Sequence, residues 1–369
     1  MKQLQIVPTI HRYAEFREFA ADFALGGKDL ILTNSYIWDP VIKKCGLDCQ
    51  LIFQEEYGTG EPSDVMINGI LRDLSGKHFD RIVAVGGGTV IDIAKVIAVS
   101  GGETDVNALF GRTDSLKRSA ELIIVPTTCG TGSEVTNISI VNRTALGTKQ
   151  GLLSEEMYAS HAVLIPEFIA TLPYSVFAAS SIDALIHAVE SFLSPLVTDY
   201  TEMYSRAAVS LILRAYKKAA EDKMNIAAYA GDFLTASNYA GIAFGNAGCG
   251  TVHAMSYAFG GKYHVAHGES NYQFFVPVLR FYRERQPSGR ISLLEEILRR
   301  ELGGSDGIRS LEELLGKIMP RNPMSAYGAV KQDVPEFAQS TVDNQQRLLA
   351  RSCVKMTVQD IADIYGKCL

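Results

Sequence analysis

The stretch from Gly248 to Asn271 holds an unusual concentration of side chains that can bind a metal. The chain has seven histidines. Three of them, His253, His264 and His267, lie in this segment, GCGTVHAMSYAFGGKYHVAHGESN. Imidazole is the commonest metal ligand among protein side chains, and it titrates near neutral pH. The segment therefore favours a metal or proton-transfer site, although a solvated surface loop with scattered histidines explains the same residues.

A second group of ligand-type side chains lies in SSIDALIHAVESFLSP, which reads as a helix. Asp183 and His187 are four residues apart and share one helix face, with Glu190 one turn further along the same side. Apolar residues occupy the rest of this helix, so we expect it to be buried. A buried carboxylate needs a cation or hydrogen-bond donors to offset its desolvation. A structural Asp–His pair is the alternative interpretation.

The two segments together supply enough ligands for one metal ion. Asp183, His187, His253 and His267 give one carboxylate and three imidazoles. This set suits Zn²⁺ and Fe²⁺ alike, and it leaves room for a substrate oxygen as an added ligand. We therefore predict one divalent metal on these four residues.

Two loops that follow apolar strands are suited to phosphate and sugar. Gly86-Gly87-Gly88-Thr89 joins a buried-type strand to a helix, whose N-terminal N–H groups favour phosphate. A tight turn that needs positive φ is the alternative. The second loop, residues 126–133 (PTTCGTGS), is rich in hydroxyl groups that can bind sugar or phosphate oxygens, and it can equally be a capped turn. Two such loops at one edge of a sheet favour a dinucleotide.

The elements that must position these residues fall into two regions. Short apolar runs alternate with helical stretches in the first region, which predicts a doubly wound α/β domain with a parallel sheet. The predicted strands cover residues 30–32, 51–53, 81–85 and 122–125, the last closing the series, and the predicted helices cover 36–44, 63–75 and 89–99. Further short strands and turns are expected between residue 120 and about residue 172. Past Pro173 helical periodicity dominates, with helices expected at 175–193, 200–220, 225–242 and 250–259, the last ending at Gly260-Gly261. We predict a dinucleotide-binding domain over 1–172 and an all-α metal-binding and substrate domain over 173–369.

Composition excludes several classes of protein. The chain is 47% hydrophobic and 21% charged with a net charge of −6, which argues against disorder and against a nucleic-acid partner. No apolar run reaches membrane-spanning length, and the N-terminus lacks a hydrophobic signal core, so we expect a cytoplasmic protein with no membrane partner. The six cysteines are scattered, and Cys45 and Cys49 are interpreted as core thiols.

Four motifs together resemble the iron-containing (group III) alcohol dehydrogenase family over most of the chain. They are GGGTVIDIAK, PTTCGTGSEVTN, DALIHAVESF and GNAGCGTVHAMSYAFGGKYHVAHGESN, in the family's order and spacing. The resemblance implies the two-domain architecture shared with dehydroquinate synthase. It also implies an NAD(H)-linked, metal-dependent enzyme that interconverts a small alcohol and its aldehyde, and a homodimer or larger homo-oligomer.

The resemblance also assigns roles to named positions. The metal ligands fall on the four residues predicted above. The cofactor contacts fall on the glycine turn, on the hydroxyl-rich loop and on one lysine: Gly87, Gly88 and Thr89, then Thr127, Thr128, Thr131 and Thr136, and finally Lys149.

Two positions depart from the family's pattern. The position after the first strand is often Asp, which disfavours a 2′-phosphate, and it is Asn34 here, so we expect NAD with some tolerance of NADP. Many members carry a second histidine near the substrate at the position of Tyr257. Tyr257 is expected to hydrogen-bond substrate or water, and His264 is either an alternative proton relay or a surface residue.

The compact length and the HAMSYAFGGKYH segment are most similar to the branch of 4-hydroxybutyrate dehydrogenases. This implies 4-hydroxybutyrate and succinate semialdehyde as the substrate pair, with Lys262, Tyr257, His264 and Arg143 as candidates to bind the carboxylate. A dehydrogenase of uncharged alcohols or diols is the alternative. A lyase resembling dehydroquinate synthase is a further alternative, which the lack of a Lys/Arg cluster near the motifs disfavours.

Overall fold

A computed structural model describes residues 2–222 and 224–369, and their contacts divide the chain into two compact units. One unit spans Ile6–Thr171 and contains a parallel sheet, and the other joins the residues up to Gln5 with Leu172–Leu369 and is helical. The predicted division at residue 172 differs from this one at the N-terminus. There the backbone of Gln5 exchanges two hydrogen bonds with the Asn246 side chain, at 2.8 and 3.0 Å.

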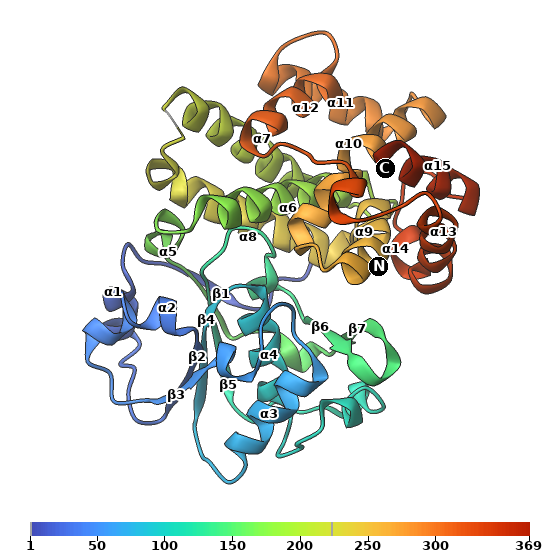
Figure 1. The fold of residues 1–369 in the computed structure, drawn as a ribbon. Helices are drawn as coiled ribbons and strands as arrows, with labels where there is room; N and C mark the ends of the chain where they lie inside the picture. Colours follow the sequence, from blue (N-terminus) through green and yellow to red (C-terminus); the bar gives the residue numbers. More distant parts are fainter. Residues whose placement is uncertain (1, 223) are drawn as a thin grey trace. The chain divides into compact units, whose positions relative to one another are not determined.

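The α/β unit is built on a parallel sheet, which within the described residues has six strands in the order β1–β8–β5–β4–β2–β3 (Figure 1). Its strands are β1 (Thr9–Arg12), β2 (Asp29–Thr33), β3 (Gln50–Phe53), β4 (Arg81–Gly86), β5 (Glu121–Pro126) and β8 (His161–Leu164). Successive residues of one strand face opposite ways: Leu30 and Leu32 enter one apolar cluster, and Ile31 enters the other. Both faces of the sheet are therefore buried, which explains the continuous apolar runs in the sequence.

Helices cover both faces of this sheet. Side chains of α3 (Asp64–Leu74) and α4 (Gly88–Val99) pack into the cluster of Leu30, whereas α1 (Phe16–Asp22) and α2 (Ser35–Trp38) contribute to the cluster of Ile31. The unit also contains a β-hairpin of β6 (Ile138–Arg143) and β7 (Thr148–Leu153), and a short helix α5 (Pro166–Ala170). The predicted doubly wound α/β domain, followed by a helical domain, is confirmed.

Three details of the predicted α/β elements were wrong. The edge strand β1 was missed because its residues, TIHR, are largely exposed and give no apolar run. The series does not close at residue 125, since the four-residue strand β8 lies between β1 and β5. The helix expected at 36–44 is split into α2 and a 3₁₀ turn at Ile42–Cys45, on either side of Pro40, whose ring cannot continue a helix.

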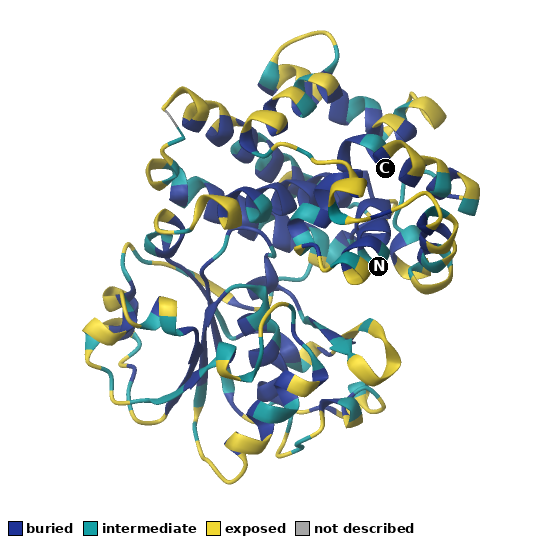
Figure 2. Ribbon diagram, in the orientation of Figure 1, coloured by how far each residue is buried: buried dark blue, intermediate teal, exposed yellow. Residues whose placement is uncertain are grey.

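The helical unit packs around α6 (Tyr174–Leu193), which lies against α7, α8 and α10 and is largely buried beyond its exposed first turn (Figure 2). The other helices are α7 (Asp199–Glu221), α8 (Ala230–Ala247), α9 (Thr251–Tyr263), α10 (His267–Arg285), α11 (Arg290–Leu302), α12 (Gly307–Ile318), α13 (Asp333–Asn344), α14 (Gln346–Leu349) and α15 (Val358–Cys368). Among the described residues α6 is long and apolar enough to cross a membrane by composition, contrary to expectation. However, 83% of the 18-residue apolar stretch of α6 that meets this criterion is buried inside the protein, as in the core helix of a globular unit.

Candidate metal centre and cofactor loops

Three helices bring the four predicted metal ligands together. Asp183 and His187 lie on one face of α6, His253 lies in the first turn of α9, and His267 is the first residue of α10. One ligand atom from each residue lies within 4.8 Å of those of all the others. The first three side chains are buried, whereas the His267 side chain is 32% exposed. The cluster is therefore accessible from the side of His267.

Asp183 is the centre of this cluster. Its carboxylate lies 3.7 Å from a ring nitrogen of His187, 3.8 Å from one of His253 and 3.9 Å from one of His267. Burial alone would raise the pKa of Asp183, but the three imidazoles and the amide of Asn271 lower it below its ordinary value. The carboxylate is therefore ionised, and it supplies the negative charge that a divalent cation needs.

The hydrogen bonding of His253 matches that of a metal ligand. Its Nδ1 lies 2.6 Å from Oε2 of Glu190, and its Nε2 lies 3.0 Å from Nε2 of His187. A carboxylate on one ring nitrogen keeps the proton there and turns the lone pair of the other nitrogen toward the metal position. Burial lowers the pKa of His253, but Cys249 and Glu190 raise it well above its ordinary value. A proton and a metal therefore compete for Nε2, and the donor set as a whole fits a divalent cation.

Glu190 and Asn271 support the cluster, and sequence reasoning gave neither of them a role. Glu190 also accepts a hydrogen bond from the backbone N–H of Val252 at 2.7 Å, so its charge stabilises the N-terminus of α9. The side-chain amide of Asn271 donates to Asp183 at 2.7 Å. The signal available in the sequence was a second carboxylate on an apolar helix, because such a group needs a buried partner.

Glycines let α9 and α10 come close to their neighbours. The expected stop at Gly260-Gly261 was wrong, since α9 continues to Tyr263. A Cβ at Gly260 would lie 2.9 Å from Oγ of Ser270 on α10, so this glycine serves close packing and not a turn. A Cβ at Gly268 would lie only 2.2 Å from the carbonyl oxygen of Ala179 on α6. The absence of a side chain at Gly268 therefore lets the start of α10, including His267, pack closely against α6.

The two residues predicted to act on the substrate occupy different settings. Tyr257 is half-buried, and its ring lies beside that of His267, with centroids 6.2 Å apart. His264 is exposed and ends α9 in the left-handed conformation, at φ 54°. Its backbone conformation gives His264 a structural role at the end of the helix, and its role as a proton relay stays a prediction.

The glycine turn and the hydroxyl-rich loop pack directly on one another in the α/β unit. Gly87 is the N-cap of α4 and has a negative φ, so the turn is not one that requires left-handed glycine. Added Cβ atoms at Gly87 and Gly88 would lie 3.3 and 2.9 Å from methyl groups of Thr128 and Thr131. The backbone N–H of Thr127 donates to the carbonyl of Gly86 at 3.0 Å. The glycines therefore serve the close approach of two backbones.

Three other predicted cofactor residues have partners within the protein. The hydroxyl of Thr89 donates to the carbonyl of Gly60 at 3.0 Å, and the ammonium of Lys149 lies 2.5 Å from the carboxylate of Glu61. Thr136 is buried and receives a hydrogen bond from Lys95 at 3.0 Å. The hydroxyl of Thr136 therefore stabilises the loop, and Lys149 must exchange Glu61 for a cofactor group if it binds one.

A buried lysine ties the two loops together, and sequence reasoning missed it. Lys95 of α4 is fully buried and also donates to Ser133 at 2.6 Å and to the carbonyl of Ile138 at 2.9 Å. Ser133 in turn donates to Asp92 at 2.8 Å. Burial lowers the pKa of Lys95 to about 8, against the opposing effect of Asp92 and Glu134.

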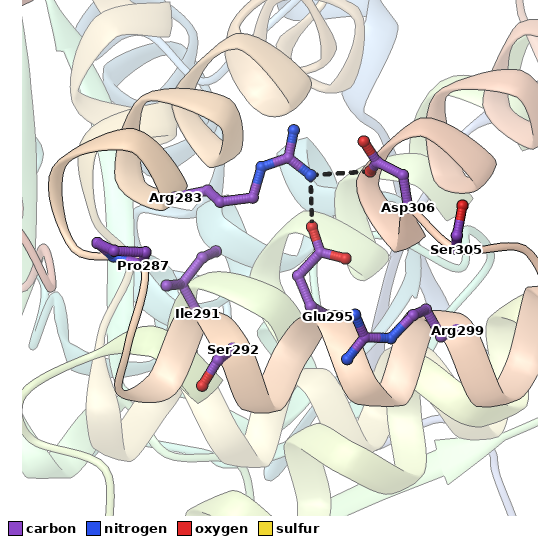
Figure 3. A pocket seen from close by; sticks show the side chains of 8 residues that line it. All are labelled: Arg283, Pro287, Ile291, Ser292, Glu295, Arg299, Ser305 and Asp306. Carbon is purple, nitrogen blue, oxygen red and sulfur yellow. Dashed lines mark hydrogen bonds and ion pairs between the residues drawn. The ribbon is translucent and has the colours of Figure 1, made fainter.

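A cavity of about 310 Å³ lies elsewhere in the helical unit, at the end of α10 and along α11 (Figure 3). Arg283 reaches into it and bonds both Glu295 and Asp306 at 2.8 Å, so the charge of Arg283 is already offset. The residues described as lining this cavity include none of the predicted site residues.

Comparison with known proteins agrees with the fold and shows the family of the chain. The model of the C-terminal part of the Fe-containing alcohol dehydrogenase family matches residues 177–369, and the iron-containing alcohol dehydrogenase model matches residues 10–166. The chain is 44% identical to the 4-hydroxybutyrate dehydrogenase of Clostridium kluyveri over the full length of both proteins. It is 31% identical to long-chain-alcohol dehydrogenase 1 of Geobacillus thermodenitrificans, over 98% of this chain and 91% of that one.

A solved structure shares the fold. Sulfoacetaldehyde reductase from Bifidobacterium kashiwanohense, in complex with NAD⁺, has a TM-score of 0.86 at 20% identity, over 100% of this chain and 98% of that one. This likeness concerns the fold, and the donor set makes the histidine cluster a candidate metal site. The chain belongs to the iron-containing alcohol dehydrogenase family and is an oxidoreductase acting on CH–OH groups. This membership sets aside the alternative of a lyase.

Replacing Gly268 with Ala tests how the metal cluster is assembled. The new Cβ would force α10 away from α6, so we expect about 1–3 kcal/mol less stability and about tenfold weaker metal binding. The matched control is Gly261→Ala, where an added Cβ meets no described atom within 4 Å. Thermal unfolding and metal titration measure both effects. Equal metal affinity in the two variants would contradict this role of Gly268.

Replacing Glu190 with Gln tests the support of His253. The amide keeps the shape of the side chain but loses the charge that holds the proton on Nδ1, so we expect metal affinity to fall about 10- to 100-fold. The control is Glu295→Gln, a buried carboxylate paired with Arg283 away from the cluster. Competition with a chelator measures the affinity, and an equal loss in both variants would point to general destabilisation.

Proposed function

We propose that the chain is an NAD(H)-linked, metal-dependent dehydrogenase that interconverts 4-hydroxybutyrate and succinate semialdehyde. The buried cluster of one carboxylate and three imidazoles is the observation that carries the metal-dependent chemistry. The choice of substrate is supported by the 44% identity to a 4-hydroxybutyrate dehydrogenase over the full length of both chains. The metal is Fe²⁺ or Zn²⁺, since this donor set suits both. A homodimer or larger assembly and a cytoplasmic location stay predictions.

The residues of the helical unit have two kinds of role at the metal: some bind the ion, and another supports a ligand. Asp183, His187, His253 and His267 would hold the ion. When bound, the ion polarises the alcohol oxygen as a Lewis acid, and NAD accepts the hydride. Glu190 keeps the proton on Nδ1 of His253, and so leaves Nε2 to face the ion.

The structure narrows the candidates for binding the substrate carboxylate. Lys262 lies 2.8 Å from Asp333 and 3.1 Å from Glu336, so its charge is already offset. Arg143 donates to Asn107 at 2.8 Å and to Gln150 at 2.7 Å. Both cations have strong partners of their own.

Tyr257 is the candidate supported by position, because its ring lies alongside that of the predicted metal ligand His267, whereas His264 is exposed at the end of α9. We therefore place the Tyr257 hydroxyl against the bound substrate. A phenol that donates to a carboxylate makes a charge-assisted hydrogen bond, and losing such a bond costs about 1.5–3 kcal/mol.

Turnover with a panel of alcohols tests the substrate. The protein should be purified without air and analysed for metal on the same sample. We expect higher kcat/KM for 4-hydroxybutyrate than for 1-butanol or 1,3-propanediol, with stoichiometric NADH, and loss of both metal and turnover in His267→Ala. Higher kcat/KM for the uncharged alcohols would overturn the choice of substrate, and full activity without metal would overturn the mechanism.

Tyr257→Phe tests the hydroxyl separately. We expect kcat/KM for 4-hydroxybutyrate to fall about 10- to 100-fold, as one charge-assisted hydrogen bond is lost, and that for 1-butanol to fall much less. The matched control is Tyr263→Phe on the same helix, whose hydroxyl donates to Asp333. An equal fall in kcat/KM for both alcohols would mean that Tyr257 does not bind the substrate carboxylate.

A further inference from the structure

The end of strand β3 places a carboxylate beside the predicted cofactor position Asn34. Strand β2 pairs in parallel with β4 on one side and with β3 on the other. The carboxyl ends of parallel strands lie along one edge of the sheet, so three segments follow one another there. They are the glycine turn after β4, Asn34 after β2, and Gln54 and Glu55 after β3.

Glu55 is held in place by residues that directly follow β2. Its Oε2 accepts a hydrogen bond from the side-chain amide of Asn34 at 2.7 Å. Its Oε1 accepts bonds from the backbone N–H of Ser35 at 2.7 Å and from the Ser35 hydroxyl at 2.5 Å. The Asn34 side chain is itself buried. The carboxylate of Glu55 is therefore fixed against the end of the neighbouring strand.

This carboxylate is ionised and partly exposed. Burial alone would raise the pKa of Glu55, but the hydrogen bonds from Ser35 and Asn34 lower it below its ordinary value. Its oxygens accept hydrogen bonds from Asn34, from Ser35 and from the backbone N–H of Glu55 itself. The side chain is partly exposed, so a ligand hydroxyl can reach the carboxylate and exchange for one of these donors.

The position of this carboxylate matches a known requirement of dinucleotide recognition. In open α/β sheets an acidic side chain that follows the strand next to the glycine-turn strand binds the 2′-hydroxyl of the adenosine ribose. It disfavours a 2′-phosphate by like-charge repulsion. Asn34 occupies that place here and is neutral, so it cannot repel a phosphate by itself.

We propose that Glu55 supplies from β3 the charge that Asn34 lacks, and that it is the residue by which this chain selects NAD(H) over NADP(H). In this arrangement Asn34 and Ser35 position Glu55, and Glu55 binds the ribose 2′-hydroxyl. The inference rests on the proposed use of NAD(H), and it goes further by naming the residue that discriminates between the two dinucleotides.

A purely structural role predicts a different outcome. Ser35 is the first residue of α2, so Glu55 also caps that short helix. Losing a cap would destabilise the α/β unit, and it would weaken the binding of NADH and the binding of NADPH to the same degree. The ratio of the two affinities therefore distinguishes the roles, since only a charge that faces the 2′ position changes that ratio.

Equilibrium binding of NADH and NADPH, followed by nucleotide fluorescence, is the test. We expect the wild type to bind NADH more tightly, and Glu55→Gln to shift the NADPH-to-NADH affinity ratio about 10- to 100-fold toward NADPH. Glu55→Asp keeps the charge and should still reject NADPH. The matched control is Glu56→Gln, an exposed neighbour, which should leave the ratio unchanged.

The proposal would be overturned by a wild type that prefers NADPH, by an unchanged ratio in Glu55→Gln, or by the same shift in Glu56→Gln. A wild type that binds neither nucleotide would overturn both the use of NAD(H) and the role of Glu55. If the ratio responds to Glu55 alone but no alcohol is oxidised, the proposed function fails while the assignment of Glu55 stands. The binding measurement thus tests the role of Glu55, and the turnover measurement tests the proposed function.

Discussion

The burial of two carboxylates on the apolar helix α6 is the constraint on which the helical unit depends. Asp183 and Glu190 are 2% and 4% exposed, and a carboxylate removed from water destabilises the fold unless cations or hydrogen-bond donors surround it. The neighbouring helices supply those donors, since α9 brings Val252 N–H and His253, and α10 brings Asn271. The contacts that pack α9 and α10 on α6 are therefore the same contacts that bring the metal ligands together.

The α/β unit buries a positive charge, which needs hydrogen-bond acceptors around it. Lys95 is fully buried, and Ser133, Thr136 and the carbonyl of Ile138 surround its ammonium group. These partners belong to the hydroxyl-rich loop and the strand that follows it, whereas Lys95 lies on the helix that begins at the glycine turn. The same network that satisfies the buried charge thus fixes the two loops on one another.

The spacing of site residues within one element could be predicted from the sequence, whereas grouping Asp183 and His187 with His253 and His267 rested on their ligand chemistry and on the family resemblance. Asp183 and His187 lie on one face because both belong to one helix, and the glycine turn lies at the edge of the sheet because a strand precedes it. What sequence reasoning missed depends on contacts between distant segments. The close packing of α9 at Gly260 involves Ser270 of another helix, and the exposed strand β1 is defined by its pairing with β8.

The same distinction explains why departures from a family pattern are hard to interpret one position at a time. On a helix such as α6, the spacing of two ligands is fixed by helical geometry, and replacing either one changes the site directly. At the edge of a parallel sheet, neighbouring strands lie about 4.8 Å apart, so a side chain from the next strand can reach the same place. Asn34 and Glu55 show this arrangement, because their side chains are in hydrogen-bond contact from adjacent strands. A neutral residue at one strand end therefore does not make the local field neutral, and the charge at such an edge must be assessed over adjacent strands together.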